Sequence, residues 1–76
     1  MAFYEWLIKF KEVDLAIGDL AEDVYRDSSF PKDSSDYDEL AFHLEDNGAC
    51  YDAIKTLEKS FEFYKNSMKE EQLHEN

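Results

Sequence analysis

The chain begins with a strongly aromatic stretch, which reads FYEWLIKF at residues 3–10. Its residues Phe3, Trp6, Leu7 and Phe10 recur at i, i+3, i+4 and i+7, the spacing of one face of an amphipathic helix. A face with so many large apolar side chains must be covered by other parts of the protein. We therefore expect residues 3–10 to form the most buried helix of the fold.

The ends of the next two helices are predicted from their capping residues. A second helix is expected to begin at Asp14, a candidate N-cap, and to end before Pro31, whose ring removes a backbone donor. A third is expected to begin at Ser35, which forms a relative of the capping box with Asp38. Gly48 then supplies the left-handed residue that commonly closes a helix.

The remaining residues predict one long helix, which starts at either Tyr51 or Thr56; both starts stay open. No segment alternates as a strand does, so the fold class is all-α, a compact bundle of four to five short helices. Residues 1–68 form one domain, and residues 69–76 are expected to be a flexible acidic tail. The expected core consists of Phe3, Trp6, Leu7, Phe10, Leu20, Val24, Phe30, Tyr37, Leu40, Leu44, Leu57, Phe61 and Tyr64.

Composition supports a folded domain with an acidic surface. The 76 residues are 43% hydrophobic and 16% aromatic, and they carry a formal net charge of -11. Thirteen acidic residues against two basic ones lie between residues 12 and 54, so the acidity belongs to the middle of the chain. Direct binding to nucleic acid is not expected, because it needs Lys and Arg against the phosphates.

The sequence favours a cytoplasmic protein. Cys50 is the sole cysteine, so no disulfide can form within the chain, as is usual in a reducing compartment. No apolar run approaches the roughly 20 residues of a membrane span, and no signal peptide is recognisable. We expect a monomer, because two chains of this charge repel each other; the lysines of the last helix leave weak self-association open.

Four segments, in this order, resemble the YozE-like family of short bacterial proteins: FYEWL at residues 3–7, FPK at 30–32, DYDEL at 36–40 and LEDN at 44–47. The resemblance covers roughly residues 3–65 and implies a fold similar to the sterile alpha motif (SAM). The family is functionally uncharacterised, so the resemblance implies no reaction. The sequence departs from the family pattern at Phe42, Phe61 and Phe63, as a divergent relative would, and a phage origin is one explanation.

Catalytic chemistry is not expected, and neither a cofactor nor a metal is predicted. His43 and Cys50 belong to no recognisable catalytic motif; a packing role is expected for His43 and a partly buried thiol for Cys50. A calcium-binding loop begun at Asp33 would place Leu44 where a bidentate Glu is required. The acids of this segment are better explained as helix caps.

Two aromatic residues point away from the predicted apolar faces. Phe42 and Phe63 are expected to be exposed anchors of a protein interface, or else to be covered by the bundle or to stand alone on the surface; these alternatives stay open. The hypothesis is a non-catalytic protein–protein interaction module with an unidentified protein partner. The alternative is an acidic decoy that mimics DNA and occupies the basic groove of a nucleic-acid-binding protein. The candidate interface consists of Phe42, Phe63, Asp36, Asp38, Glu39, Glu45 and Asp46.

Overall fold

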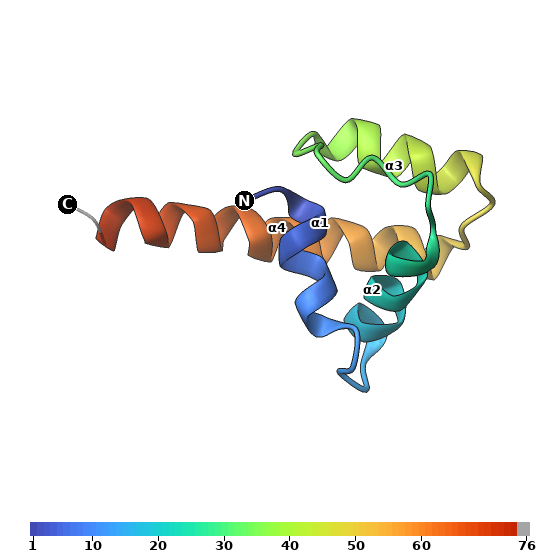
Figure 1. Cartoon of the computed structure of the whole chain (residues 1–76), viewed down its shortest axis with the longest axis horizontal. Coiled ribbons are helices and arrows are strands. Elements are labelled where there is room, and N and C mark those ends of the chain that lie inside the picture. The colour runs from blue at the N-terminus through green and yellow to red at the C-terminus, as the bar shows by residue number, and fades with distance from the viewer. Residues whose placement is uncertain (75–76) are drawn as a thin grey trace.

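The computed structural model describes the backbone of residues 1–74 and the side chains of residues 1–69. Within these residues the chain forms helices and no strand, which confirms the all-α prediction (Figure 1). The elements are α1 (Phe3–Leu7), a 3-10 turn η1 (Ile8–Phe10), α2 (Ala16–Arg26), α3 (Tyr37–Asp46) and α4 (Tyr51–His74). Among the described helices none is both long enough and apolar enough to cross a membrane.

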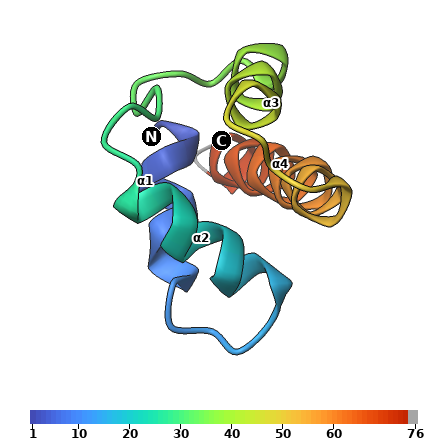
Figure 2. The ribbon, with the colours of Figure 1, turned by 90° about the vertical axis from the view of Figure 1, so that its right-hand side faces the viewer.

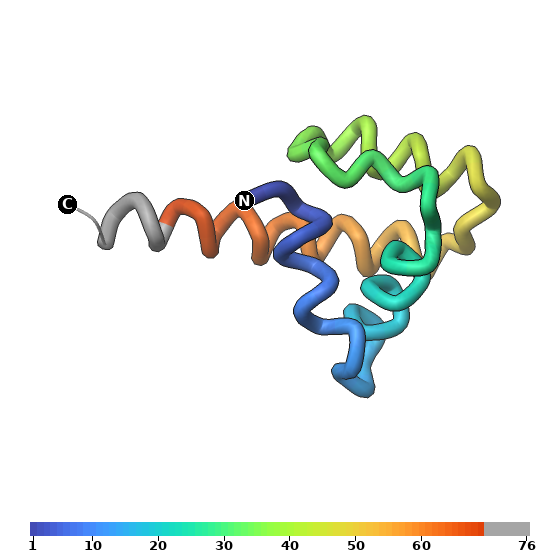
Figure 3. The backbone as a smooth tube through the Cα atoms, in the orientation of Figure 1, coloured from blue at the N-terminus to red at the C-terminus, as the bar shows by residue number. Residues whose placement is uncertain are grey.

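Helix α4 is the element on which the others assemble. Within the described residues, its backbone lies close to that of α1, α2 and α3, whereas the backbone of α3 lies close to no helix other than α4. Figures 1 and 2 show α3 alongside α4 on one side, with α1 and α2 on another. The described part of α4 extends past α1 towards its C-terminal end, as the tube in Figure 3 shows. A single long helix therefore carries both the core contacts and a large free surface.

The aromatic stretch at the N-terminus forms the centre of the core, as predicted. Phe3 is completely buried, and its ring centroid lies 5.8 Å from that of Trp6, 5.2 Å from Phe61 and 5.4 Å from Tyr64. The Tyr64 hydroxyl donates a hydrogen bond to the Met1 carbonyl. The start of the chain is thus held against the middle of α4 by both packing and a hydrogen bond.

The predicted core is confirmed except at its edge. Eleven of the expected residues are buried, while Phe10 and Tyr37 are only half-buried. Phe10 lies at the end of η1, where the Trp6 ring covers one side at 4.9 Å. Tyr37 opens α3 and rests against Phe61, with ring centroids 5.6 Å apart. Phe10 is the last residue of η1 and Tyr37 is the first residue of α3, so neighbouring side chains surround them from fewer directions.

Two of the predicted caps are wrong. Leu15, not Asp14, holds the N-cap position of α2, and no side chain caps that helix. Asp36 caps α3, because its carboxylate accepts a hydrogen bond from the Asp38 backbone N–H at 3.1 Å. The hydroxyl of Ser35 is instead hydrogen-bonded to the Tyr64 hydroxyl at 3.2 Å. A tertiary contact therefore takes the serine that local sequence assigned to the cap.

The two ends of α4 settle one open question. The helix starts at Tyr51, and Thr56 lies inside it, where its hydroxyl donates to the Asp52 carbonyl at 2.9 Å. Gly48, with φ of 81°, forms the left-handed turn expected before it. The backbone is helical to His74, beyond the predicted tail boundary at residue 69; residues 75–76 lie outside the described part, and mobility of the tail stays a prediction.

Gly18 permits a close approach that the sequence did not reveal. A side chain carbon at this buried position would collide with the backbone carbonyl of Val13. The loop before α2 folds back over the first turn of the helix, where the Gly18 N–H donates to the Leu15 carbonyl at 2.9 Å. The glycine is therefore a packing requirement at this site and not a weak point in the helix.

Candidate functional site

The outward side of α3 combines an exposed aromatic ring with carboxylates. Phe42 is 71% exposed, whereas Leu40, Ala41 and Leu44 of the same helix are buried against the core. Residues three or four positions apart are neighbours on a helix surface, so four exposed acids surround Phe42. We call this surface the α3 acidic face: Asp36, Asp38, Glu39, Phe42, Glu45 and Asp46.

Helix stability explains three of these five acids. Asp36 caps α3, and Asp38 and Glu39 lie in its first turn, where the helix dipole favours negative charge. Glu45 and Asp46 lie at the opposite end, where the same dipole disfavours a carboxylate. Their position therefore needs a reason other than the stability of α3.

The carboxylates affect Tyr37, an ionisable group that lies half-buried at the start of α3. Burial raises the pKa of the Tyr37 hydroxyl, and the charges of Glu58, Glu45 and Asp38 raise it further. Glu58 belongs to α4, so the negative potential near Tyr37 comes from both helices. Burial and the neighbouring carboxylates thus act in the same direction, and both favour the neutral form of the Tyr37 hydroxyl.

Phe63 occupies a different setting from Phe42. It is 65% exposed on α4, in a shallow hollow that it lines together with Lys59, Glu62 and Asn66. Both aromatic side chains are exposed, so neither is covered by the bundle, and their role as interface anchors stays a prediction. The structure gathers the α3 members of the candidate interface on one helix face and places Phe63 on another helix among mixed charges.

His43 joins α3 to the loop that follows α2. Its Nε2 lies 2.7 Å from Oδ2 of Asp27, and its ring meets the Phe30 ring edge-on at 5.5 Å. The other oxygen of Asp27 accepts hydrogen bonds from the Ser29 N–H at 2.9 Å and from the Ser29 hydroxyl at 2.6 Å. The bonds from Ser29 and then from His43 lower the pKa of Asp27 to about 2.

This Ser–Asp–His cluster does not have the arrangement of a nucleophile and its base. The carboxylate of Asp27 lies between the other two residues, and the Ser29 hydroxyl donates to it and not to His43. The imidazole of His43, which would be the base in such a triad, therefore does not accept the serine proton. The cluster fixes the loop against α3, which agrees with the packing role expected for His43.

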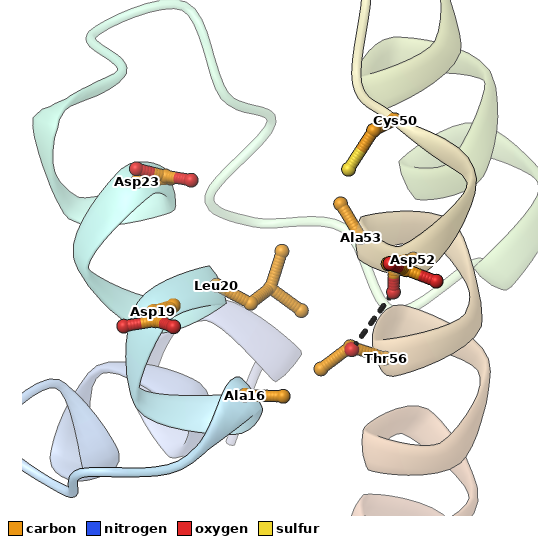
Figure 4. A pocket seen from close by; sticks show the side chains of 8 residues that line it. All are labelled: Ala16, Asp19, Leu20, Asp23, Cys50, Asp52, Ala53 and Thr56. Atoms are coloured by element: carbon orange, nitrogen blue, oxygen red, sulfur yellow. Dashed lines mark hydrogen bonds between the residues drawn. The ribbon is translucent and has the colours of Figure 1, made fainter.

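A groove separates α2 from the first turns of α4 (Figure 4). Its floor is formed by Leu20 of α2 and Ala53 of α4, and the carboxylates of Asp19, Asp23 and Asp52 lie along its edges. The remaining lining residues are Ala16, Cys50 and Thr56. Sequence analysis missed this groove because its two walls are more than twenty residues apart in the chain.

Cys50 stands at the end of the groove, and its sulfur points towards the space between the two helices. The thiol is free and exposed, so the prediction of a partly buried thiol is wrong. The reason is its position directly before α4, at the end of the short turn from α3. Among the described residues, no three His, Cys, Asp or Glu side chains are placed to hold a metal ion.

Comparison with known proteins gives one consistent result. The family model described as YozE SAM-like fold matches residues 2–66. A UPF0346 protein of Bacillus pumilus is 38% identical over 65 residues, which are 83% of this chain and 88% of that protein. A UPF0346 protein of Leuconostoc mesenteroides is 35% identical over 65 residues, 83% of this chain and 87% of its own length. No solved structure gives a significant match.

Proposed function

The chain belongs to the YozE family of SAM-like proteins, and from this starting point we propose that it is a non-catalytic protein-interaction module that binds its partner through the α3 acidic face. One observation carries the proposal: Phe42 is 71% exposed at the centre of a ring of carboxylates. Large aromatic side chains at the centre of a surface supply much of the energy in protein interfaces, and a charged rim supplies specificity.

The magnitudes favour Phe42 as the anchor. Burying a phenylalanine side chain contributes about 2 kcal/mol, and hot-spot residues in interfaces reach similar values. An exposed ion pair at the rim is worth only about 0.5 kcal/mol. The ring therefore dominates affinity, whereas the acids select a partner with Lys or Arg around an apolar pocket.

The first experiment is capture of the partner from a lysate of the native host by the tagged protein. Phe42→Ala should reduce recovery of the partner by about tenfold, as expected for the loss of roughly 1.4 kcal/mol. Phe63→Ala tests the second aromatic separately. Tyr51→Ala is the matched control, because Tyr51 is equally exposed, at 73%, and lies outside the α3 acidic face. Unchanged recovery with a folded Phe42→Ala protein would refute the proposal.

A second candidate function is an acidic decoy that occupies the basic groove of a DNA-binding protein, as a phage-encoded inhibitor would. It is favoured by Glu45 and Asp46, which the helix dipole opposes and which a mimic of phosphate charges would retain. Its partner should be displaced by duplex DNA, and binding should weaken steeply with salt. If the affinity for the partner does not depend on salt concentration and does not change when the five acids are replaced by amides, the decoy function is excluded. Those replacements are Asp36→Asn, Asp38→Asn, Glu39→Gln, Glu45→Gln and Asp46→Asn.

We also propose a cytoplasmic monomer with no direct affinity for nucleic acid. The single exposed thiol of Cys50 supports a reducing compartment, and the net charge of -11 supports both other statements. Light scattering after size-exclusion chromatography checks the monomer. A gel-shift assay with duplex DNA at moderate salt should show no complex.

A further inference from the structure

The groove between α2 and α4 offers an apolar floor beneath a negatively charged edge. Leu20 is nearly buried and Ala53 half-buried, so the floor presents methyl groups. Asp19, Asp23 and Asp52 are exposed and come from both walls, as Figure 4 shows. No Lys or Arg lines the groove.

The three carboxylates are not neutralised by ion pairs within the described side chains. The ion pairs there join Arg26 with Glu22 and His43 with Asp27, and neither involves the edges of the groove. Asp19 and Asp52 lie in first helical turns, where the dipole favours them, but Asp23 lies deep inside α2. Charge of one sign along an apolar concavity attracts a ligand of the opposite sign that also has an apolar part.

The groove continues beyond Cys50. A second hollow shares Leu20, Asp23, Cys50 and Ala53 with the first, and it extends over Val24 towards the turn between α3 and α4. An elongated channel of this kind suits an extended or helical segment better than a small cation. It does not include the exposed side chains of the α3 acidic face.

We propose that this groove binds a short basic peptide segment of a partner protein. An apolar side chain of the peptide rests on Leu20 and Ala53, and flanking Lys or Arg side chains pair with Asp19, Asp23 and Asp52. The thiol of Cys50 lies beside the bound segment. This surface is separate from the α3 acidic face, so the inference does not depend on the proposed function.

The test uses a fluorescein-labelled peptide of repeated Lys-Leu-Lys units and the full chain. Binding is followed by fluorescence anisotropy. The variant Asp19→Asn, Asp23→Asn, Asp52→Asn should bind about tenfold more weakly, as expected when three partly exposed ion pairs are lost. The matched variant Asp38→Asn, Glu45→Gln, Asp46→Asn removes the same charge from α3 and should change affinity less than about threefold. Replacing Leu by Ser in the peptide should also weaken binding, because the apolar floor then has no partner.

Cys50 provides a second readout that attraction by overall charge would not move. Saturating peptide should slow alkylation of Cys50 by iodoacetamide about fivefold, since the bound segment shields the sulfur. Equal weakening by the two triple variants, or an unchanged alkylation rate at saturation, overturns the groove proposal. Loss of peptide binding in the α3 variant alone would also overturn it, while leaving the α3 acidic face as a binding surface.

Discussion

Phe30 and Phe42 both lie at α3 but differ in their surroundings, because Phe30 packs in the interior against the helix and Phe42 is exposed on it. Phe30 is 3% exposed and packs between Tyr4 and the inner-face residue His43, with ring centroids at 5.9 Å and 5.5 Å. Phe42 is 71% exposed among carboxylates. The same residue type thus stabilises the fold in the interior and, on our proposal, binds a partner at the surface. Mutations should separate stability from binding across this single helix.

The largest expected effect is on the inner side. Phe30→Ala should lower the free energy of unfolding by about 3–5 kcal/mol, because it leaves a cavity between the loop and α3. Urea denaturation followed by circular dichroism at 222 nm measures the change. Phe30→Leu is the control and should lose far less, since it keeps most of the buried volume. A loss of less than about 1 kcal/mol for the alanine variant would mean that the loop does not close the core.

The two glycines give the same contrast, because Gly18 is buried and Gly48 is exposed. Gly18→Ala should destabilise the protein by about 2 kcal/mol, because the added carbon collides with the rigid backbone of Val13. Gly48→Ala should lose only about 1 kcal/mol, since its positive φ is strained for alanine although nothing lies within 4 Å. Thermal unfolding of both variants tests the order. A Gly18→Ala protein at least as stable as the native chain would contradict the close approach.

Asp27 is neither a core residue nor a fully exposed one, since its side chain is 28% exposed. Its pKa of about 2 lies below the ordinary 3.8, so its stabilising effect is full above that ordinary value and is lost as pH falls towards 2. Asp27→Asn should therefore lower stability by about 1 kcal/mol at neutral pH. Near pH 2 the native and variant proteins should be equally stable.

Urea unfolding at the two pH values provides the measurement. Asp33→Asn is the control, because Asp33 is an exposed acid in the same loop and the substitution removes the same charge. A difference between native protein and Asp27→Asn that stays constant from neutral to acid pH would show that the hydrogen bonds from Ser29 and His43 do not depend on the charge of Asp27.

The sequence predicted those parts of the fold that follow from periodicity. The stripe of Phe3, Trp6 and Leu7 predicted a buried helix, and the same reasoning applied to α3 placed Phe42 off the inner face while leaving its exposure open. Periodicity assigns a face to each residue without knowing what covers it. The choice between Tyr51 and Thr56 was therefore beyond its reach.

The features that sequence analysis missed depend on contacts between distant segments. Ser35 lost its predicted capping role because the Tyr64 hydroxyl, twenty-nine residues away, is hydrogen-bonded to it. The need for glycine at position 18 stayed hidden in the same way, because the Val13 carbonyl comes close to it only in the folded loop before α2. The groove has the same origin, since Leu20 and Ala53 meet only in the folded chain.

The smallest expected change in stability belongs to the outer side. Phe42→Ala should alter the free energy of unfolding by less than about 0.5 kcal/mol, because an exposed ring leaves no cavity and alanine has the higher helix propensity. The same substitution should reduce partner recovery about tenfold. Phe42→Ala should thus affect binding and not stability, whereas Phe30→Ala should mainly affect stability. Urea denaturation and capture assays on both variants measure the free energy of unfolding and the partner recovery, respectively. If Phe42→Ala lost as much stability as Phe30→Ala, the Phe42 ring would stabilise the fold, and the proposal that the α3 acidic face binds a partner would be refuted.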